Sequence, residues 1–194
     1  MILFLTNNEV TAPLKNWLVK REEVCTVSEK LSLSALRTIA PQYIVSYNYL
    51  HIITPDIIQW MDGNIVNLHI SYLPWNKGTH PNFWAFLEET PHGVTIHQID
   101  AGLDTGGIYA QQELWFSPSE ETFQSSYQKL HEAIQQLFCK VWPDIKSGAL
   151  QPVPQIAGGS FHKRKDLEPI NSIFPIDWNM NVQTYLEEYR RHLS

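Results

Sequence analysis

The sequence predicts an α/β fold: a Rossmann-like, mostly parallel sheet with helices on both faces and some antiparallel strand pairing in its second half. Short apolar runs of strand length alternate with segments of helical periodicity over about the first 70 residues. Strands that alternate with helices form parallel sheets covered on both faces. Further on, a short glycine-rich loop joins two alternating strand segments, which indicates an antiparallel pair.

The first part of the chain reads β-α-β-α-β-α-β. Ile2–Leu5 is an apolar run typical of a strand buried on both faces, and Pro13 fits the first turn of the helix that follows. Pro41 ends the second helix. The strands are expected at 2–5, 23–28, 43–47 and 65–70, and the helices at 10–20, 31–39 and 55–60.

The second part continues with a helix, two strands and the longest helix of the chain. These elements are expected at 82–89, 94–99, 108–116 and from 119–122 to about 146. Pro143 predicts a kink or break in the long helix. Residues 1–150 are expected to form the main domain, and 151–194, with its prolines, a basic cluster at 162–165 and a final helix at 182–192, a C-terminal extension packed on it.

Composition limits the classes of function. The net charge of −6 and the pI near 5.7 argue against a nucleic-acid-binding protein, because phosphate neutralisation needs a basic surface. Cys25 and Cys139 have no companion at metal-ligand spacing, so we expect buried thiols in a reducing compartment. No apolar run approaches the ~18 residues that a membrane helix needs, and the start lacks a signal-peptide pattern, so we expect a cytoplasmic protein away from membranes.

Two polar side chains interrupt the apolar strand at 65–70. Asn67 and His69 are two residues apart, so they lie on one face of the strand, at its carboxyl end. Asp104 follows in a glycine-rich loop and is the third candidate. Open α/β sheets bind ligands at the carboxyl ends of their strands, and an amide, an imidazole and a carboxylate there can serve one reacting centre. His97 and Gln98 lie nearby on opposite faces of their strand, so at most one of them points at this site.

Each of these residues also has a structural interpretation. A lone strand histidine is often a satisfied core residue, Asn67 could bridge loops, and Asp104 could form an Asx turn before Gly106. Competing catalytic motifs are missing from the sequence: it has no Gly-x-Gly-x-x-Gly after the first strand, no Walker loop and no Gly-x-Ser-x-Gly elbow. His80 and His92 are expected in loops, and neither pairs with Asp or Cys at metal spacing, so we expect no zinc site.

The segment Asn-Leu-His-Ile-Ser-Tyr-Leu-Pro at 67–74, together with Gly-Leu-Asp-Thr-Gly at 102–106, resembles the signature of the folate-dependent formyltransferases. Order and spacing agree over about residues 40–115, and Ile-Asp-Trp at 176–178 is similar to the end of the catalytic domain in several members. Two departures are the missing glycine-rich phosphate loop at 6–10 and Gly107, where many members have proline.

The resemblance implies a Rossmann-like catalytic domain at 1–150 that takes 10-formyltetrahydrofolate as its formyl donor, without a metal. It implies that Asn67, His69 and Asp104 are catalytic. In this chemistry an amine attacks the formyl carbon, Asn67 and His69 stabilise the resulting oxyanion, and Asp104 holds His69 or accepts the amine proton. The loop at 47–53 falls where the family cradles the pterin, largely through backbone groups. The residues expected there are Tyr47, Asn48, Tyr49, Leu50, His51 and Ile52.

The segment at 73–84 is most similar to the sugar N-formyltransferases, so a nucleotide-linked amino sugar, bound to dTDP or UDP, is the expected acceptor. Trp75, Asn76 and Lys77 are the expected substrate contacts, and either Lys77 or the basic run 163–165 could meet the diphosphate. A glycinamide ribonucleotide-type formyltransferase, a formyltetrahydrofolate hydrolase and a non-enzymatic folate- or sugar-binding module are the alternatives. The aromatic-rich tail at 174–189 could cover a homodimer surface.

Overall fold

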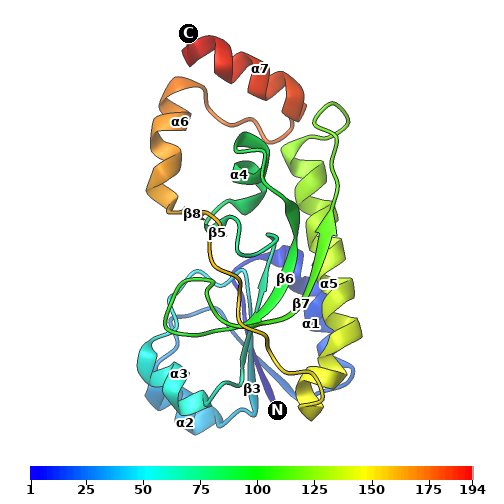
Figure 1. Cartoon of the computed structure of the whole chain (residues 1–194). Helices are drawn as coiled ribbons and strands as arrows, with labels where there is room; N and C mark the ends of the chain where they lie inside the picture. Colours follow the sequence, from blue (N-terminus) through cyan, green and yellow to red (C-terminus); the bar gives the residue numbers. More distant parts are fainter. Residues whose placement is uncertain (194) are drawn as a thin grey trace.

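The computed structural model describes residues 1–193 and is built on one six-stranded sheet in the order β2-β1-β3-β4-β6-β7 (Figure 1). The strands are β1 (Ile2–Leu5), β2 (Val24–Val27), β3 (Tyr43–Tyr47), β4 (Ile65–His69), β6 (His92–Gln98) and β7 (Ile108–Leu114). β1 is parallel to β2 and β3, and β3 is parallel to β4. β6 is antiparallel to both β4 and β7. The predicted mixed sheet is therefore confirmed.

Helices cover both faces of this sheet. The helices of the structure are α1 (Ala12–Val19), α2 (Leu33–Ile39), α3 (Pro55–Met61), α4 (Pro81–Leu87), α5 (Phe123–Ser147), α6 (Leu167–Ile173) and α7 (Val182–Leu193), with short 3-10 turns η1 (Glu9–Thr11) and η2 (Arg164–Asp166). α1 and α5 lie on one face, and α2 and α3 on the other (Figure 1). This is the two-sided covering that the alternation of strands and helices predicts.

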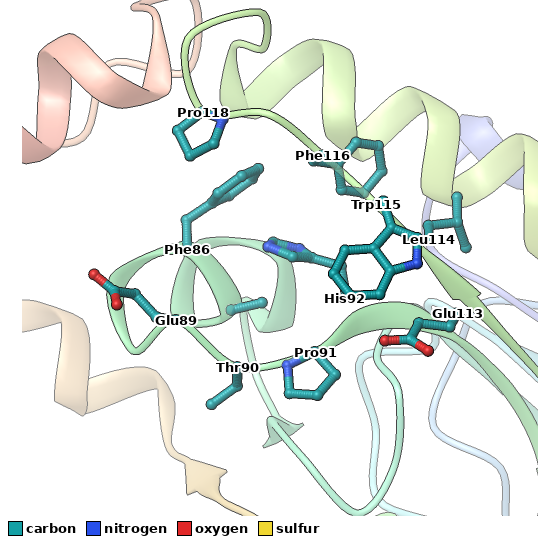
Figure 2. Close-up of a pocket in the computed structure, with 11 residues that line it drawn as sticks. Phe86, Glu89, Thr90, Pro91, His92, Glu113, Leu114, Trp115, Phe116 and Pro118 are labelled. Carbon is teal, nitrogen blue, oxygen red and sulfur yellow. The ribbon is translucent and has the colours of Figure 1, made fainter.

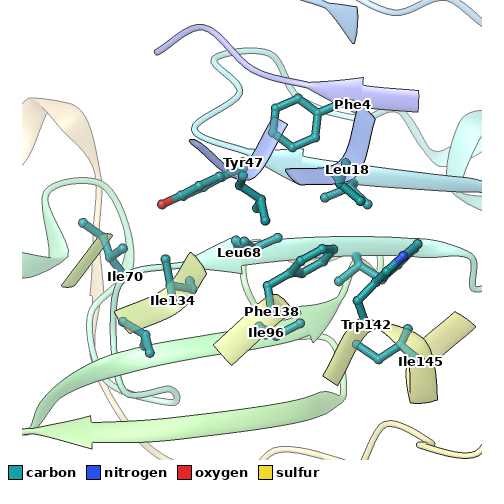
Figure 3. Packing of buried hydrophobic residues seen from close by; sticks show 14 of the residues in the cluster. Phe4, Leu18, Tyr47, Leu68, Ile70, Ile96, Ile134, Phe138, Trp142 and Ile145 are labelled. Carbon is teal, nitrogen blue, oxygen red and sulfur yellow. The ribbon is translucent and has the colours of Figure 1, made fainter. Parts of the chain in front are cut away.

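Large apolar side chains between the sheet and α5 form the main core. Figure 3 shows Phe138 and Trp142 of α5 packed with Leu18 of α1 and with Phe4 of β1. All four are at most 2% exposed, and the rings of Phe138 and Trp142 stack with centroids 5.1 Å apart. Burying one such side chain contributes about 1.5–3 kcal/mol, so this layer fixes α5 against the sheet.

The side chains of β4 alternate between the two faces. Val66 and Leu68 point into the α1/α5 core, whereas Ile65 belongs to the core under α2 and α3. Alternation puts Asn67 and His69 on the same side as Ile65, beyond the end of the apolar layer. The apolar residues of β4 therefore fix the direction in which its two polar side chains point.

A second core joins the C-terminal helices to the rest of the chain. Tyr185 of α7 is fully buried and lies edge-on to Phe83 of α4 and Phe123 of α5. Phe174 and Tyr189 also pack in this cluster. The aromatic tail that we considered for a dimer surface thus packs substantially within its own chain.

Three local features differ from the sequence expectations. α6 was not among the expected elements of the proline-containing extension; its Pro169 lies in the first turn, where a missing N–H costs nothing. The short pair β5 (Lys77–Gly78) and β8 (Phe161–His162) joins segments too far apart in sequence to predict. α5 continues through Pro143 to Ser147, so the expected break is wrong.

Both cysteines are free thiols of intermediate exposure rather than fully buried ones. Burial still raises the pKa of Cys139. Within residues 1–193 no helix is long and apolar enough to cross a membrane.

Candidate active site

The structure brings Asn67, His69 and Asp104 together at the carboxyl end of β4. The Asn67 Nδ2 donates to Asp104 Oδ1 at 3.4 Å, and His69 Nε2 lies 3.8 Å from Asp104 Oδ2. His69 and Asp104 are buried, and Asn67 is partly exposed. We refer to these three residues as the triad.

Asp104 lies in the loop after β6, and a backbone N–H of β5 (Lys77–Gly78) holds its carboxylate. Asp104 has a left-handed φ of 54°, and its Oδ2 accepts the Gly78 N–H at 2.8 Å. Gly106 allows the loop to close, because a Cβ there would lie 1.9 Å from the Gln98 carbonyl oxygen.

Burial by itself would raise the pKa of Asp104. The charge of His69, the charge and hydrogen bond of His97 when it is protonated, and the Gly78 N–H outweigh that effect and hold the pKa of this carboxyl well below its usual range. Asp104 is therefore a carboxylate at neutral pH.

His97 is a fourth polar residue at this site. It is the cross-strand partner of Asn67, and its Nε2 lies 3.1 Å from Asn67 Nδ2 and 3.4 Å from Asp104 Oδ1. Its Nδ1 donates to the Gln98 carbonyl at 2.8 Å, so in the neutral ring Nε2 accepts from Asn67, and only the protonated ring can donate to Asp104. Strand alternation left His97 and Gln98 as rival candidates; only the register between β6 and β4 selects His97.

The expected substrate contacts 75–77 lie beside the triad with unequal exposure. The Asn76 side chain is fully buried, donates to Thr90 Oγ1 at 2.7 Å and accepts from Ser160 Oγ at 3.0 Å, so it points into the protein. Its carbonyl accepts from His69 Nε2 at 3.1 Å. Trp75 and Lys77 are partly exposed.

The loop between β3 and α3 begins at the same end of the sheet as the triad. Tyr47 points to the opposite face, where its hydroxyl hydrogen-bonds His131 Nδ1. The Tyr49 hydroxyl donates to the Glu29 carbonyl and so ties the loop to the chain after β2. Leu50 and Ile52 are 78% and 82% exposed.

Asn48 and His51 complete the expected set in this loop. Asn48 has a left-handed φ of 52°, and its carbonyl accepts the Asn7 N–H at 3.1 Å. Asn7 Oδ1 in turn accepts the Leu50 N–H at 2.9 Å, so the loop is fixed while its apolar side chains point outward. His51 packs edge-on against the Tyr49 ring.

A cavity of about 350 Å³ lies at the far end of β6 from the triad (Figure 2). Phe86 and His92 point into it, and Trp115, which is 87% exposed, flanks it. Burial lowers the pKa of His92 to about 4. None of the triad residues lines this cavity. Among residues 1–193, no group of three or more His, Cys, Asp or Glu side chains is placed to hold a metal ion.

The family model of the formyl transferases matches residues 13–142, a span that contains the triad and most of the sheet. The chain belongs to the formyl transferase family. Two methionyl-tRNA formyltransferases are similar: that of Myxococcus xanthus is 34% identical over 158 residues, or 78% of this chain and 50% of the relative. That of Dictyoglomus turgidum is 31% identical over 175 residues, or 87% of this chain and 54% of the relative. The chain thus spans about half the length of the curated relatives it matches.

Among solved structures of the family, the formyltransferase PseJ from Anoxybacillus kamchatkensis is similar over the whole fold. It is 40% identical, with a TM-score of 0.86, and the match covers 95% of this chain and 96% of PseJ. The PseJ structure is a complex with UDP-4,6-dideoxy-4-formamido-L-AltNAc and tetrahydrofolate. A sugar N-formyltransferase-like protein of Mycobacterium tuberculosis, Rv3404c, shares the fold at 22% identity and a TM-score of 0.79, with 100% of this chain and 87% of that chain covered.

Proposed function

We propose that this protein is an N-formyltransferase that moves a formyl group from 10-formyltetrahydrofolate to the amine of a UDP-linked 4-amino sugar. The observation that carries the proposal is the convergence of Asn67, His69 and the ionised Asp104 at one sheet end. We further propose that residues 1–150 form the catalytic domain and that the rest is a C-terminal extension.

The triad supplies the groups that formyl transfer needs. The amine nitrogen forms a bond to the formyl carbon and loses a proton, while the bond from that carbon to the folate N10 breaks and N10 gains a proton. Negative charge develops on the formyl oxygen, which Asn67 Nδ2 and His69 stabilise as hydrogen-bond donors. To do so, each exchanges a hydrogen bond that it makes within the protein in this structure for one to the substrate. The Asp104 carboxylate stabilises a protonated His69 or takes up the amine proton directly.

The loop after β3 is suited to hold the folate. Leu50 and Ile52 expose apolar side chains on a loop that begins at the same end of the sheet as the triad, and a flat apolar ligand can cover them. Within residues 1–193, the backbone N–H and C=O groups of His51 and Ile52 make no hydrogen bond, so they are available to the edge of a pterin ring. We expect the folate contacts of this loop to come from its backbone and these apolar side chains, not from the Tyr47 ring on the other face.

The likeness to PseJ over nearly the full length of both chains supports a UDP-linked 4-amino sugar as the acceptor. Trp75 and Lys77 are the exposed members of the loop after β4 and are proposed to contact it, with Lys77 or the basic run 163–165 near the diphosphate. Methionyl-tRNA is the rival acceptor, because the two curated relatives are named methionyl-tRNA formyltransferases. The net charge of −6 disfavours an RNA ligand.

The test is to incubate the protein with 10-formyltetrahydrofolate and to follow tetrahydrofolate release with and without an acceptor. The acceptors are a UDP-linked 4-amino-4,6-dideoxy sugar, a dTDP-linked 4-amino sugar, glycinamide ribonucleotide and methionyl-tRNA. Release that requires the UDP-linked sugar, with a formamido product by mass spectrometry, supports the proposal. Release without any amine identifies a hydrolase, and no release under any condition refutes both enzymatic functions.

A further inference from the structure

The segment that joins α5 to α6 runs back across the end of the sheet and contacts both loops that carry the site (Figure 1). We call residues 151–162 the strap. At its start, Val153 and Ile108 exchange two backbone hydrogen bonds of 2.8 and 2.9 Å, which fix the strap to β7. At its end, β8 pairs with β5.

Gln155 of the strap holds the Asp104 loop. Its Nε2 donates to the carbonyl oxygens of Asp104 at 2.8 Å and of Gly106 at 2.9 Å. One side-chain amide thus closes the loop from both sides of Thr105. Since Asp104 has a left-handed φ of 54°, a second restraint on its carbonyl helps to hold this residue in a conformation that it rarely adopts.

Ser160 of the strap holds the partner of His69. Its Oγ accepts the Asn76 N–H at 2.9 Å and donates to Asn76 Oδ1 at 3.0 Å. The carbonyl of Asn76 accepts from His69 Nε2 at 3.1 Å, so His69 carries its proton on Nε2, the nitrogen closest to Asp104. Asn76 also has a left-handed φ of 54°, which Ser160 helps to stabilise.

The end of the strap packs closely against the loop after β4, which contains Pro74 and Asn76. Gly159 has φ of +86°, and a Cβ there would lie 1.9 Å from the Pro74 carbonyl oxygen. The Gly78 N–H, which donates to Asp104 Oδ2, belongs to the strand that pairs with β8. The strap therefore restrains the groups that face both His69 and Asp104.

We propose that Gln155 and Ser160 are positioning residues that set the geometry and tautomer of the His69–Asp104 pair, a role that rests on the proposed function. Gln155 acts through the backbone of the Asp104 loop, and Ser160 acts through the Asn76 carbonyl. Neither side chain carries out a chemical step. Small displacements at a reacting centre slow the reaction strongly. We therefore expect loss of either anchor to raise the activation free energy of the reaction more than it lowers the free energy of unfolding.

The kinetic test compares Gln155→Glu with wild type. Glu keeps the size of the side chain but places carboxylate oxygens against two carbonyl oxygens, so both hydrogen bonds are lost. We expect kcat to fall at least about tenfold, with KM for each substrate within about twofold. Gln151→Glu is the matched control: Gln151 lies at the start of the strap, and among residues 1–193 its side chain donates only to the nearby Gly148 carbonyl, at 2.7 Å. A kcat within about twofold of wild type for Gln155→Glu would overturn the role of Gln155.

The spectroscopic test follows the ring nitrogens of His69 by ¹⁵N NMR of the ligand-free protein. In wild type the Nε2–H form should dominate; Ser160→Ala should produce a mixture of tautomers, and Ser160→Thr, which keeps the hydroxyl, should restore the wild-type signal. Unchanged His69 signals in Ser160→Ala overturn the role of Ser160. This measurement needs no acceptor, so it decides the positioning role of Ser160 even if wild type transfers no formyl group, a result that would refute only the proposed function.

Discussion

Asp104→Asn isolates the charge of the triad without changing its shape. The His69 Nε2 and Asp104 Oδ2 atoms lie 3.8 Å apart in a buried site. At an effective dielectric constant of about 20, opposite unit charges at this distance attract by about 4 kcal/mol. If His69 becomes protonated as the formyl oxygen gains charge, the variant loses that stabilisation in the transition state alone. We therefore expect kcat to fall by about 10³.

The assay is tetrahydrofolate release under saturating donor and UDP-linked amino sugar, with the melting temperature measured alongside. Asp100→Asn is the control, because Asp100 lies in the same loop but its carboxylate bonds Thr105 and the Gly102 N–H instead of the triad. The surrounding charges and N–H hold the pKa of Asp104 below its usual range, so wild-type kcat should show no acid limb from this group between about pH 5 and 8. An Asp104→Asn protein that is folded and keeps more than a tenth of wild-type kcat would refute the role of this carboxylate.

Three further outcomes follow from burial and exposure. Ile52→Ser, at an 82% exposed position, should raise KM for the folate severalfold and leave the melting temperature unchanged; an unaltered KM argues against a folate contact there. Phe138→Ala should lower the free energy of unfolding by about 3–5 kcal/mol in urea titrations, because the ring is fully buried, and a cost below about 1 kcal/mol would contradict the core packing. Burial lowers the pKa of His131 to about 4, so protonation favours unfolding and wild type should lose up to about 3 kcal/mol as the pH falls from 6.5 to 4. His131→Gln should flatten this part of the stability curve, whereas His192→Gln, at the exposed end of α7, should not.

Periodicity and composition were enough to predict the fold class. Strand and helix segments alternate strictly up to β4, and local propensity, proline positions and apolar spacing mark them without reference to distant residues. The same local information put Asn67 and His69 on one face, because a period of two is a property of the strand itself. The glycines of the Asp104 loop mark it in the sequence, and in the structure a Cβ at any of the three, Gly102, Gly106 or Gly107, would lie too close to a neighbouring atom.

The local sequence does not reveal where the side chains of Tyr47 and Asn76 point. β3 is apolar on both faces, so its pattern does not reveal which way Tyr47 points, and the structure places its ring on the α5 side. Asn76 appears as a polar loop residue in sequence, but its side chain bonds Thr90 and Ser160 inside the protein. Only partners far along the chain distinguish a ligand contact from an internal hydrogen bond.

The sequence by itself determined the order of the elements, the shared face of Asn67 and His69, and the resemblance that pointed to formyl transfer. The tertiary structure decided which residues surround that pair. The register of β6 against β4 selected His97, and the return of the chain after α5 brought Gln155 and Ser160 to loops that precede them by about 50 to 84 residues. Strand periodicity is a local property, whereas register and loop contacts depend on how the whole core packs.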